Sequence, residues 1–73
     1  MPKLPQVKPR VLAKILQKKG FLERPTKSSH VGYVHPDGRR TTIAFHNKPI
    51  PKGTLRAILR QADIPVEEFV KLL

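Results

Sequence analysis

The sequence predicts an α+β fold in which a three-stranded antiparallel sheet carries helices on one face. Apolar residues recur at helical spacing near both ends of the chain. Between those stretches, alternating apolar and polar residues flank a Pro-Asp-Gly segment, which is typical of a β-hairpin. The 73 residues suffice for one small core. We therefore expect a single domain over 1–73, with the order α-β-β-β-α followed by a short C-terminal helix.

The chain begins with a predicted arm and a helix. Residues 1–7 contain two prolines and few apolar side chains, so we expect a leading arm there. Pro9 suits the first position of a helix, where its missing N–H needs no partner. Gly20 is the expected stop, because it adopts the left-handed conformation that ends many helices. One face of this helix is predicted from residues at helical spacing, which are Val11, Leu12, Ile15, Leu16 and Lys19, with Lys14 and Lys18 on the opposite face.

Three strands are predicted next. A short strand over 21–24 is followed by Pro25, which favours the sheet edge because proline cannot donate to a ladder. Strands over 30–35 and 40–45 are joined by Pro36-Asp37-Gly38, which fits a three-residue hairpin loop. This loop pairs position 33 with 41 and position 31 with 43.

That register sorts the hairpin side chains onto two faces. The predicted buried face carries Val31, Tyr33, Thr41, Ile43 and Phe45. The opposite face, called the open face below, carries His30, Gly32, Val34, Arg40, Thr42, Ala44 and His46. Because glycine and alanine leave the middle of the open face flat, an RNA backbone could lie there.

Two helices complete the fold. The second begins at Gly53-Thr54-Leu55, and a last short helix begins after Pro65. Both main helices are expected to cover the same face of the sheet. The predicted buried stripe of the second helix is Leu55, Ile58, Leu59 and Ala62. In the last helix the residues predicted to point one way are Val66, Phe69, Val70 and Leu73.

The charge of the chain indicates a polyanionic partner. Fifteen Lys and Arg against five Asp and Glu give a net charge of +10. Such an excess favours binding to nucleic acid, or to an acidic protein that resembles it, over a generic soluble basic protein. The absence of cysteine excludes disulfides and thiolate metal sites. The N-terminus lacks the apolar run of a signal peptide, and we expect a cytoplasmic protein.

The three histidines differ in context. His30 begins a strand on the open face and follows two hydroxyl residues and Lys27, which makes it the first candidate for proton transfer. His46, just beyond a strand, is a second candidate. His35 ends a strand on the core side before the turn, and we interpret it as structural. The turn is expected to return Arg39 and Arg40 toward His30.

RNA cleavage is the chemistry that these residues favour. Without a metal ion it needs a base for the 2′-hydroxyl proton, an acid for the leaving 5′-oxygen and positive charge at the phosphate. His30 can be base or acid, and the register places His46 one diagonal step away, about 7–8 Å at the backbone. The candidates for RNA binding are Lys27, Ser29, Arg40, Lys48 and Lys52. No metal or cofactor is expected, because the histidines lack metal-ligand spacing.

Several blocks of the sequence resemble the HicA family, small toxins of bacterial and archaeal toxin–antitoxin pairs. The blocks are Lys18-Lys19-Gly20-Phe21, Ser29-His30, Tyr33, His35 to Arg40, and Pro51 to Ala62. The resemblance implies a fold like the double-stranded-RNA-binding domain and a metal-independent mRNA endoribonuclease. It also implies a HicB-type antitoxin that blocks the active site. The catalytic histidine of the family's Gly-Ser-His motif matches His30, although this chain has Ser28 where the family usually has Gly.

Two other interpretations remain open from the sequence. A non-catalytic RNA-binding module of the same fold explains the charge equally well and needs no special histidine. A DNA-binding regulator is less favoured, because no helix-turn-helix pattern supports it.

Overall fold

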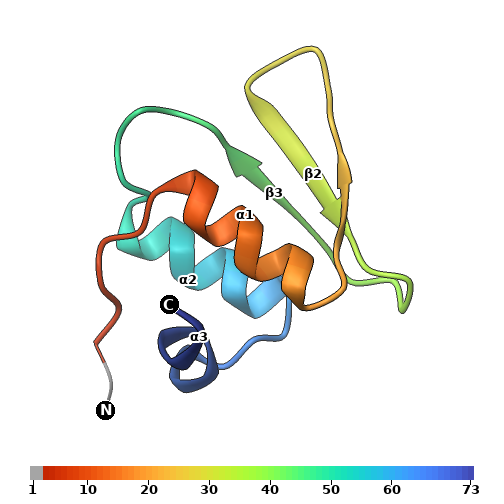
Figure 1. Cartoon of the computed structure of the whole chain (residues 1–73). Coiled ribbons are helices and arrows are strands. Elements are labelled where there is room, and N and C mark those ends of the chain that lie inside the picture. Colours follow the sequence, from red (N-terminus) through yellow and green to blue (C-terminus); the bar gives the residue numbers. More distant parts are fainter. Residues whose placement is uncertain (1–2) are drawn as a thin grey trace.

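The computed structural model describes residues 3–73 and has the predicted α+β fold (Figure 1). Its three strands form one antiparallel sheet in the order β1-β2-β3. Helices α1 and α2 lie side by side on one face of this sheet, and α3 packs beneath them, away from the strands. The elements are α1 (Pro9–Lys18), β1 (Leu22–Arg24), β2 (His30–Val34), β3 (Arg40–Ala44), α2 (Lys52–Gln61) and α3 (Val66–Leu72).

Helix α1 begins and ends as predicted. Pro9 occupies its first turn, and Gly20 follows its end with a φ of +95°. The Gly20 N–H donates to the carbonyl of Gln17 and the Phe21 N–H to that of Leu16, both at 3.0 Å. This pair of bonds is a Schellman motif, which satisfies carbonyls left open at the helix end. Of the apolar residues at helical spacing, Leu12, Ile15 and Leu16 are buried, whereas Val11 is 41% exposed. Ala13 completes the buried face.

Substitution of Gly20 should destabilise the fold. A Cβ on Gly20 would lie 3.0 Å from His35 Nε2, and the positive φ is unfavourable for any L side chain. We expect Gly20→Ala to lower the free energy of unfolding by about 1–2 kcal/mol. Gly53→Ala is the matched control, because Gly53 lies in α2. Within residues 3–73 a Cβ there would meet nothing within 4 Å apart from its chain neighbours and the backbone of its own helix, so alanine should stabilise slightly. Urea unfolding of both variants measures the difference, and equal effects would refute this account.

The leading segment is part of the core, which corrects the expectation of an arm. Leu4 and Val7 are only 2% and 3% exposed. The Ile50 N–H donates to the Val7 carbonyl at 2.8 Å, which joins this segment to the chain that precedes α2. The first two residues of the predicted arm, Met1 and Pro2, lie outside the described residues.

The hairpin has the predicted register. Tyr33 pairs with Thr41 and Val31 with Ile43. The Gly38 N–H closes the turn onto the His35 carbonyl at 2.9 Å. Both strands are one residue shorter than predicted, ending at Val34 and Ala44. Burial of the Tyr33 side chain, and its hydrogen bond to Glu23, raise the pKa of the Tyr33 phenol far above its usual range. The phenol is therefore a neutral donor inside the core.

The C-terminal helices cover the core largely as expected. The stripe predicted for the second helix is buried, with Leu55, Ile58 and Leu59 in α2 and Ala62 directly after it. In α3, Phe69 is fully buried. Asp63, with a φ of 56°, ends α2 in the same way that Gly20 ends α1, and the Ile64 N–H donates to the Leu59 carbonyl at 2.9 Å. Leu73, predicted to point the same way as Phe69, lies beyond the end of α3 at Leu72 and is 51% exposed. Leu72 packs against the core instead.

Candidate open-face site

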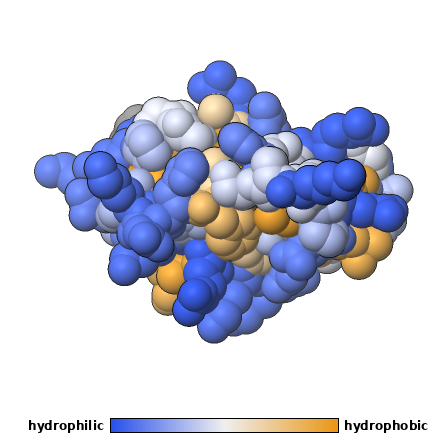
Figure 2. Space-filling view, turned by 90° about the horizontal axis from the view of Figure 1, so that it is seen from above, coloured by the Kyte–Doolittle hydropathy of each residue, from blue (hydrophilic) through white to orange (hydrophobic). Residues whose placement is uncertain are grey.

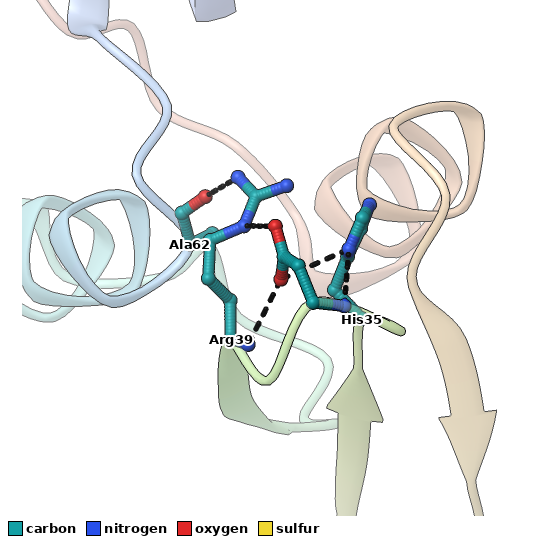
Figure 3. Close-up of polar contacts among 4 residues, drawn as sticks. His35, Arg39 and Ala62 are labelled. Atoms are coloured by element: carbon teal, nitrogen blue, oxygen red, sulfur yellow. Dashed lines mark hydrogen bonds and ion pairs between the residues drawn. The ribbon is translucent and has the colours of Figure 1, made fainter.

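The turn between β2 and β3 is a structural network rather than part of the site (Figure 3). The Asp37 carboxylate accepts the backbone N–H of Arg39 at 3.0 Å and its Nε at 2.8 Å. These contacts with Arg39 hold the pKa of Asp37 below its usual range. The Arg39 guanidinium also donates to the Ala62 carbonyl and lies 5.2 Å from the centre of the Phe21 ring. Arg39 therefore ties the hairpin to the end of α2 and does not turn toward His30.

His35 belongs to the same network, as predicted. Its Nδ1 accepts the Asp37 N–H at 3.1 Å, and its ring meets Phe21 edge to face with the centroids 5.2 Å apart. Its side chain is mostly covered. His35 is thus a turn-packing residue.

The loop before β2 is shaped by hydroxyl groups. The Ser28 N–H donates to Thr26 Oγ1 at 3.2 Å, and the His30 N–H donates to Ser28 Oγ at 3.1 Å. The Thr26 hydroxyl in turn hydrogen-bonds to the His30 carbonyl. Within residues 3–73 the only positive φ outside glycine belongs to Asp63, so Ser28 occupies its position without backbone strain. Serine in place of the family's glycine therefore fixes the backbone entering His30.

His30 is exposed on the open face at the start of β2. It pairs with Ala44, the last residue of β3, and His46 follows two residues later, also exposed. The two histidines therefore lie at the same end of the sheet. Seen from above, toward this end, the surface is mainly hydrophilic and has an apolar strip across its middle (Figure 2).

The remaining candidates separate into two groups. Lys27 and Ser29 are exposed in the loop that leads into His30. Arg40 pairs with Val34, four residues along β2 from His30, which is about 13 Å at 3.3 Å per residue. The expectation that the turn returns Arg40 beside His30 is thus wrong: Arg40 lies on the open face, but at its opposite end.

The two lysines after β3 line different grooves. Lys48 lies with His46 in a groove of ≈ 380 Å³ beside the end of β3. Lys52 borders a separate groove of ≈ 500 Å³ with Lys3 and Arg56. Of the two lysines, only Lys48 therefore shares a groove with a candidate histidine.

Two open-face residues were not predicted from the sequence. Arg24 pairs with Gly32 and Leu22 with Val34, which places both β1 side chains on the open face. Arg24 is consequently a diagonal neighbour of His30, about 7–8 Å away at the backbone, and much closer than Arg40. Leu22 is 57% exposed. Pro25 marked the end of β1 in the sequence. Which β1 side chains face outward, however, follows only from the residues of β2 with which they pair.

Residues 3–73 contain neither a cluster of metal-binding side chains nor a helix suited to span a membrane. In this part of the chain no cluster of three or more His, Cys, Asp or Glu side chains could hold a metal ion. No helix here has the length and apolar character to cross a membrane.

Fold and site together define a small, strongly basic α+β protein that presents an exposed histidine, hydroxyls and arginines on one sheet face. The family model described as HicA toxin of bacterial toxin-antitoxin matches residues 10–64. The chain therefore belongs to the HicA toxin family. This is a family of ribonuclease-type toxins, and membership implies an antitoxin partner. A search of curated proteins found no match.

Proposed function

We propose that this chain is a metal-independent endoribonuclease that cleaves mRNA on the open face, with His30 as its catalytic residue. The supporting observation is the placement of His30. Its side chain is exposed, its backbone is bonded to the Thr26 and Ser28 hydroxyls, and Arg24 is its diagonal neighbour. An accessible imidazole on a fixed backbone, beside positive charge, is what phosphodiester cleavage needs.

The proposed reaction uses the RNA's own nucleophile. His30 accepts the proton of the 2′-hydroxyl while O2′ forms a bond to phosphorus and the bond from phosphorus to O5′ breaks. The leaving O5′ takes a proton from the acid, for which His46 is the second candidate. The products are a 2′,3′-cyclic phosphate and a 5′-hydroxyl.

Positive charge on and around the open face supports RNA binding. Arg24, Lys27 and Ser29 surround the proposed scissile phosphate. Arg40, at the far end of the same face, would contact a phosphate further along the RNA, as would Lys48 from the loop after β3. Lys52, the first residue of α2, lies at a separate groove and would add only long-range positive charge.

We propose that a HicB-type antitoxin neutralises the toxin by covering the open face. Its surface would be acidic, to match the net charge of +10, and would compete with RNA for Arg24 and Arg40. Leu22 and its cross-strand partner Val34 offer an apolar contact on this face. Such a contact adds stability to a complex whose charges speed its formation.

Replacing the 2′-hydroxyl at the cleavage site by hydrogen should abolish cleavage, because the deoxy substrate lacks the nucleophile. The same oligonucleotide in all-RNA form is the control, and it should be cut equally well in excess EDTA. Gel analysis with end labelling identifies the 5′-hydroxyl product. Activity that EDTA removes and a divalent ion restores would contradict the proposal. RNA binding without cleavage would instead support the non-catalytic module.

Arg24 and Arg40 should affect the reaction differently. Because Arg24 is the nearer to His30, Arg24→Gln should slow single-turnover cleavage of bound RNA at least about tenfold. Arg40→Gln removes the same charge from the same face, but it should weaken binding and leave the rate for bound RNA nearly unchanged. Rates at saturating enzyme separate the two effects. Equal losses of rate in the two variants would show that Arg24 is no closer than Arg40 to the reacting phosphate.

A further inference from the structure

Strand β3 has a free edge. Among residues 3–73, its only neighbour in the sheet is β2. The Phe45 N–H donates to the Ser29 carbonyl at 2.9 Å, and the His35 N–H to the Arg39 carbonyl at 2.8 Å. Because backbone hydrogen bonds alternate along an antiparallel pair, these two bonds show that the odd-numbered residues of β3 bond to β2. The backbone groups that point away from β2, and that no hydrogen bond joins to another residue in the described range 3–73, are those of Arg40, Thr42 and Ala44.

The two edges of the sheet differ in protection. Strand β1 has only three residues, carries Glu23 and Arg24, and is followed by Pro25. Short length, charge and proline are the usual devices that prevent further pairing at an edge. Strand β3 has five residues, RTTIA, of which only the first, Arg40, is charged and none is proline. The β3 edge is therefore the one able to accept another strand.

Space for another strand lies beside β3. A groove of ≈ 590 Å³ is bordered by Arg40 and Thr42 on the strand and by Ala57 and Gln61 on α2. The groove of ≈ 380 Å³ described above continues past Ala44. Both grooves are lined by Thr54 and Ile58 as well, so they meet along α2.

We propose that the β3 edge pairs, antiparallel, with an extended acidic segment of a partner protein, in the way that peptides add a strand to an exposed sheet. The inference rests on the proposed function in one respect, since it names the antitoxin as the partner and describes how it engages the sheet. Charge favours this occupant. Arg40 stands at one end of the edge and Lys48 lies beyond the other, in a chain of net charge +10. A second copy would bring equal positive charges together.

The even-numbered residues of β3 carry the outward backbone groups, and this predicts the side-chain pattern of the partner segment. Residues opposite Arg40, Thr42 and Ala44 would share the open face and should be acidic. Residues between them would point to the helix side, over Ala57 and Ile58, and should be small or apolar. In an antiparallel pair, the partner residues opposite the even positions are also those whose N–H groups bond to β3.

A capped peptide of about six residues that alternates Glu and Val is the probe. Hydrogen exchange measured by NMR should slow about tenfold or more at the Thr42 and Ala44 amides when the peptide is added. N-methylation of the Glu amides should remove binding, whereas N-methylation of the Val amides should preserve it. The two methylated peptides have identical composition, so the comparison isolates the backbone bonds.

Variants of the protein supply the reciprocal test. Thr42→Pro removes an edge N–H without removing a bond to β2, and should weaken peptide binding about tenfold. Thr42→Ala keeps the N–H and should bind like the parent. Should proline unfold the hairpin, Ala57→Gln fills the groove from an exposed helix position, and Ala57→Ser is its size control.

Three results would overturn the proposal. They are equal binding of both methylated peptides, self-association of the toxin through β3 in sedimentation experiments, and protection of the same amides by RNA alone. Cleavage assays distinguish this inference from the proposed function. Ala57→Gln, which changes an exposed residue of α2 outside the open face, should still cleave RNA. Amide protection by the peptide does not depend on whether the chain is a nuclease.

Discussion

His30→Ala should lower the rate of RNA cleavage by about 10²–10⁴, which is the usual contribution of general acid–base catalysis. The fold should not change. The imidazole is exposed and makes no side-chain hydrogen bond among residues 3–73, so its removal leaves no cavity and no unpaired buried group. Single-turnover kinetics with urea unfolding of the same preparation measures both quantities. An undiminished rate would remove His30 from the site.

His46→Ala is the matched control for this prediction. It removes an equally exposed imidazole at the same end of the sheet, and we expect a smaller loss of rate. Added imidazole should partly restore cleavage by His30→Ala, because the vacated position is open to solvent. A purely structural role for His30 would not give such rescue.

The hairpin shows why much of the fold could be predicted from the sequence. Pro36-Asp37-Gly38 sets the loop length, the loop length sets the register, and the register fixes which side chains face inward. Gly20 similarly marks a helix end through local backbone chemistry. The burial of Leu4 and Val7 could not be predicted in this way. It depends on contact with Ile50, far along the chain, and a short proline-containing segment has no periodicity to reveal it.

The candidate site was predictable where its residues are neighbours in the chain. Lys27, Ser29 and His30 are adjacent in sequence and stay together in space. Arg24 was missed because the pairing offset between β1 and β2 depends on the loop that joins them, which the sequence pattern does not specify. Arg40 was misplaced for a different reason. The predicted register already put it opposite Val34, and its sequence position next to the turn was given too much weight.

Binding of single-stranded RNA should weaken about 50-fold when the salt concentration rises fourfold. This follows from four phosphate contacts, because the logarithm of the association constant falls by about 0.7 per contact for each tenfold rise in salt concentration. The four cations that we assign to these contacts are Arg24, Lys27, Arg40 and Lys48. Fluorescence anisotropy with His30→Ala, which binds without cutting, measures the slope.

Loss of one contact should be visible in that slope. Lys27→Gln should reduce the change over the same salt range to about 20-fold, because three contacts remain. Lys71→Gln removes the same charge from α3, which lies away from the sheet, and should leave the slope unchanged. The two variants have equal net charge, so any difference between them reports where the RNA lies. If both variants reduce the slope equally, the positive charge acts diffusely and the open face is not the RNA-binding surface.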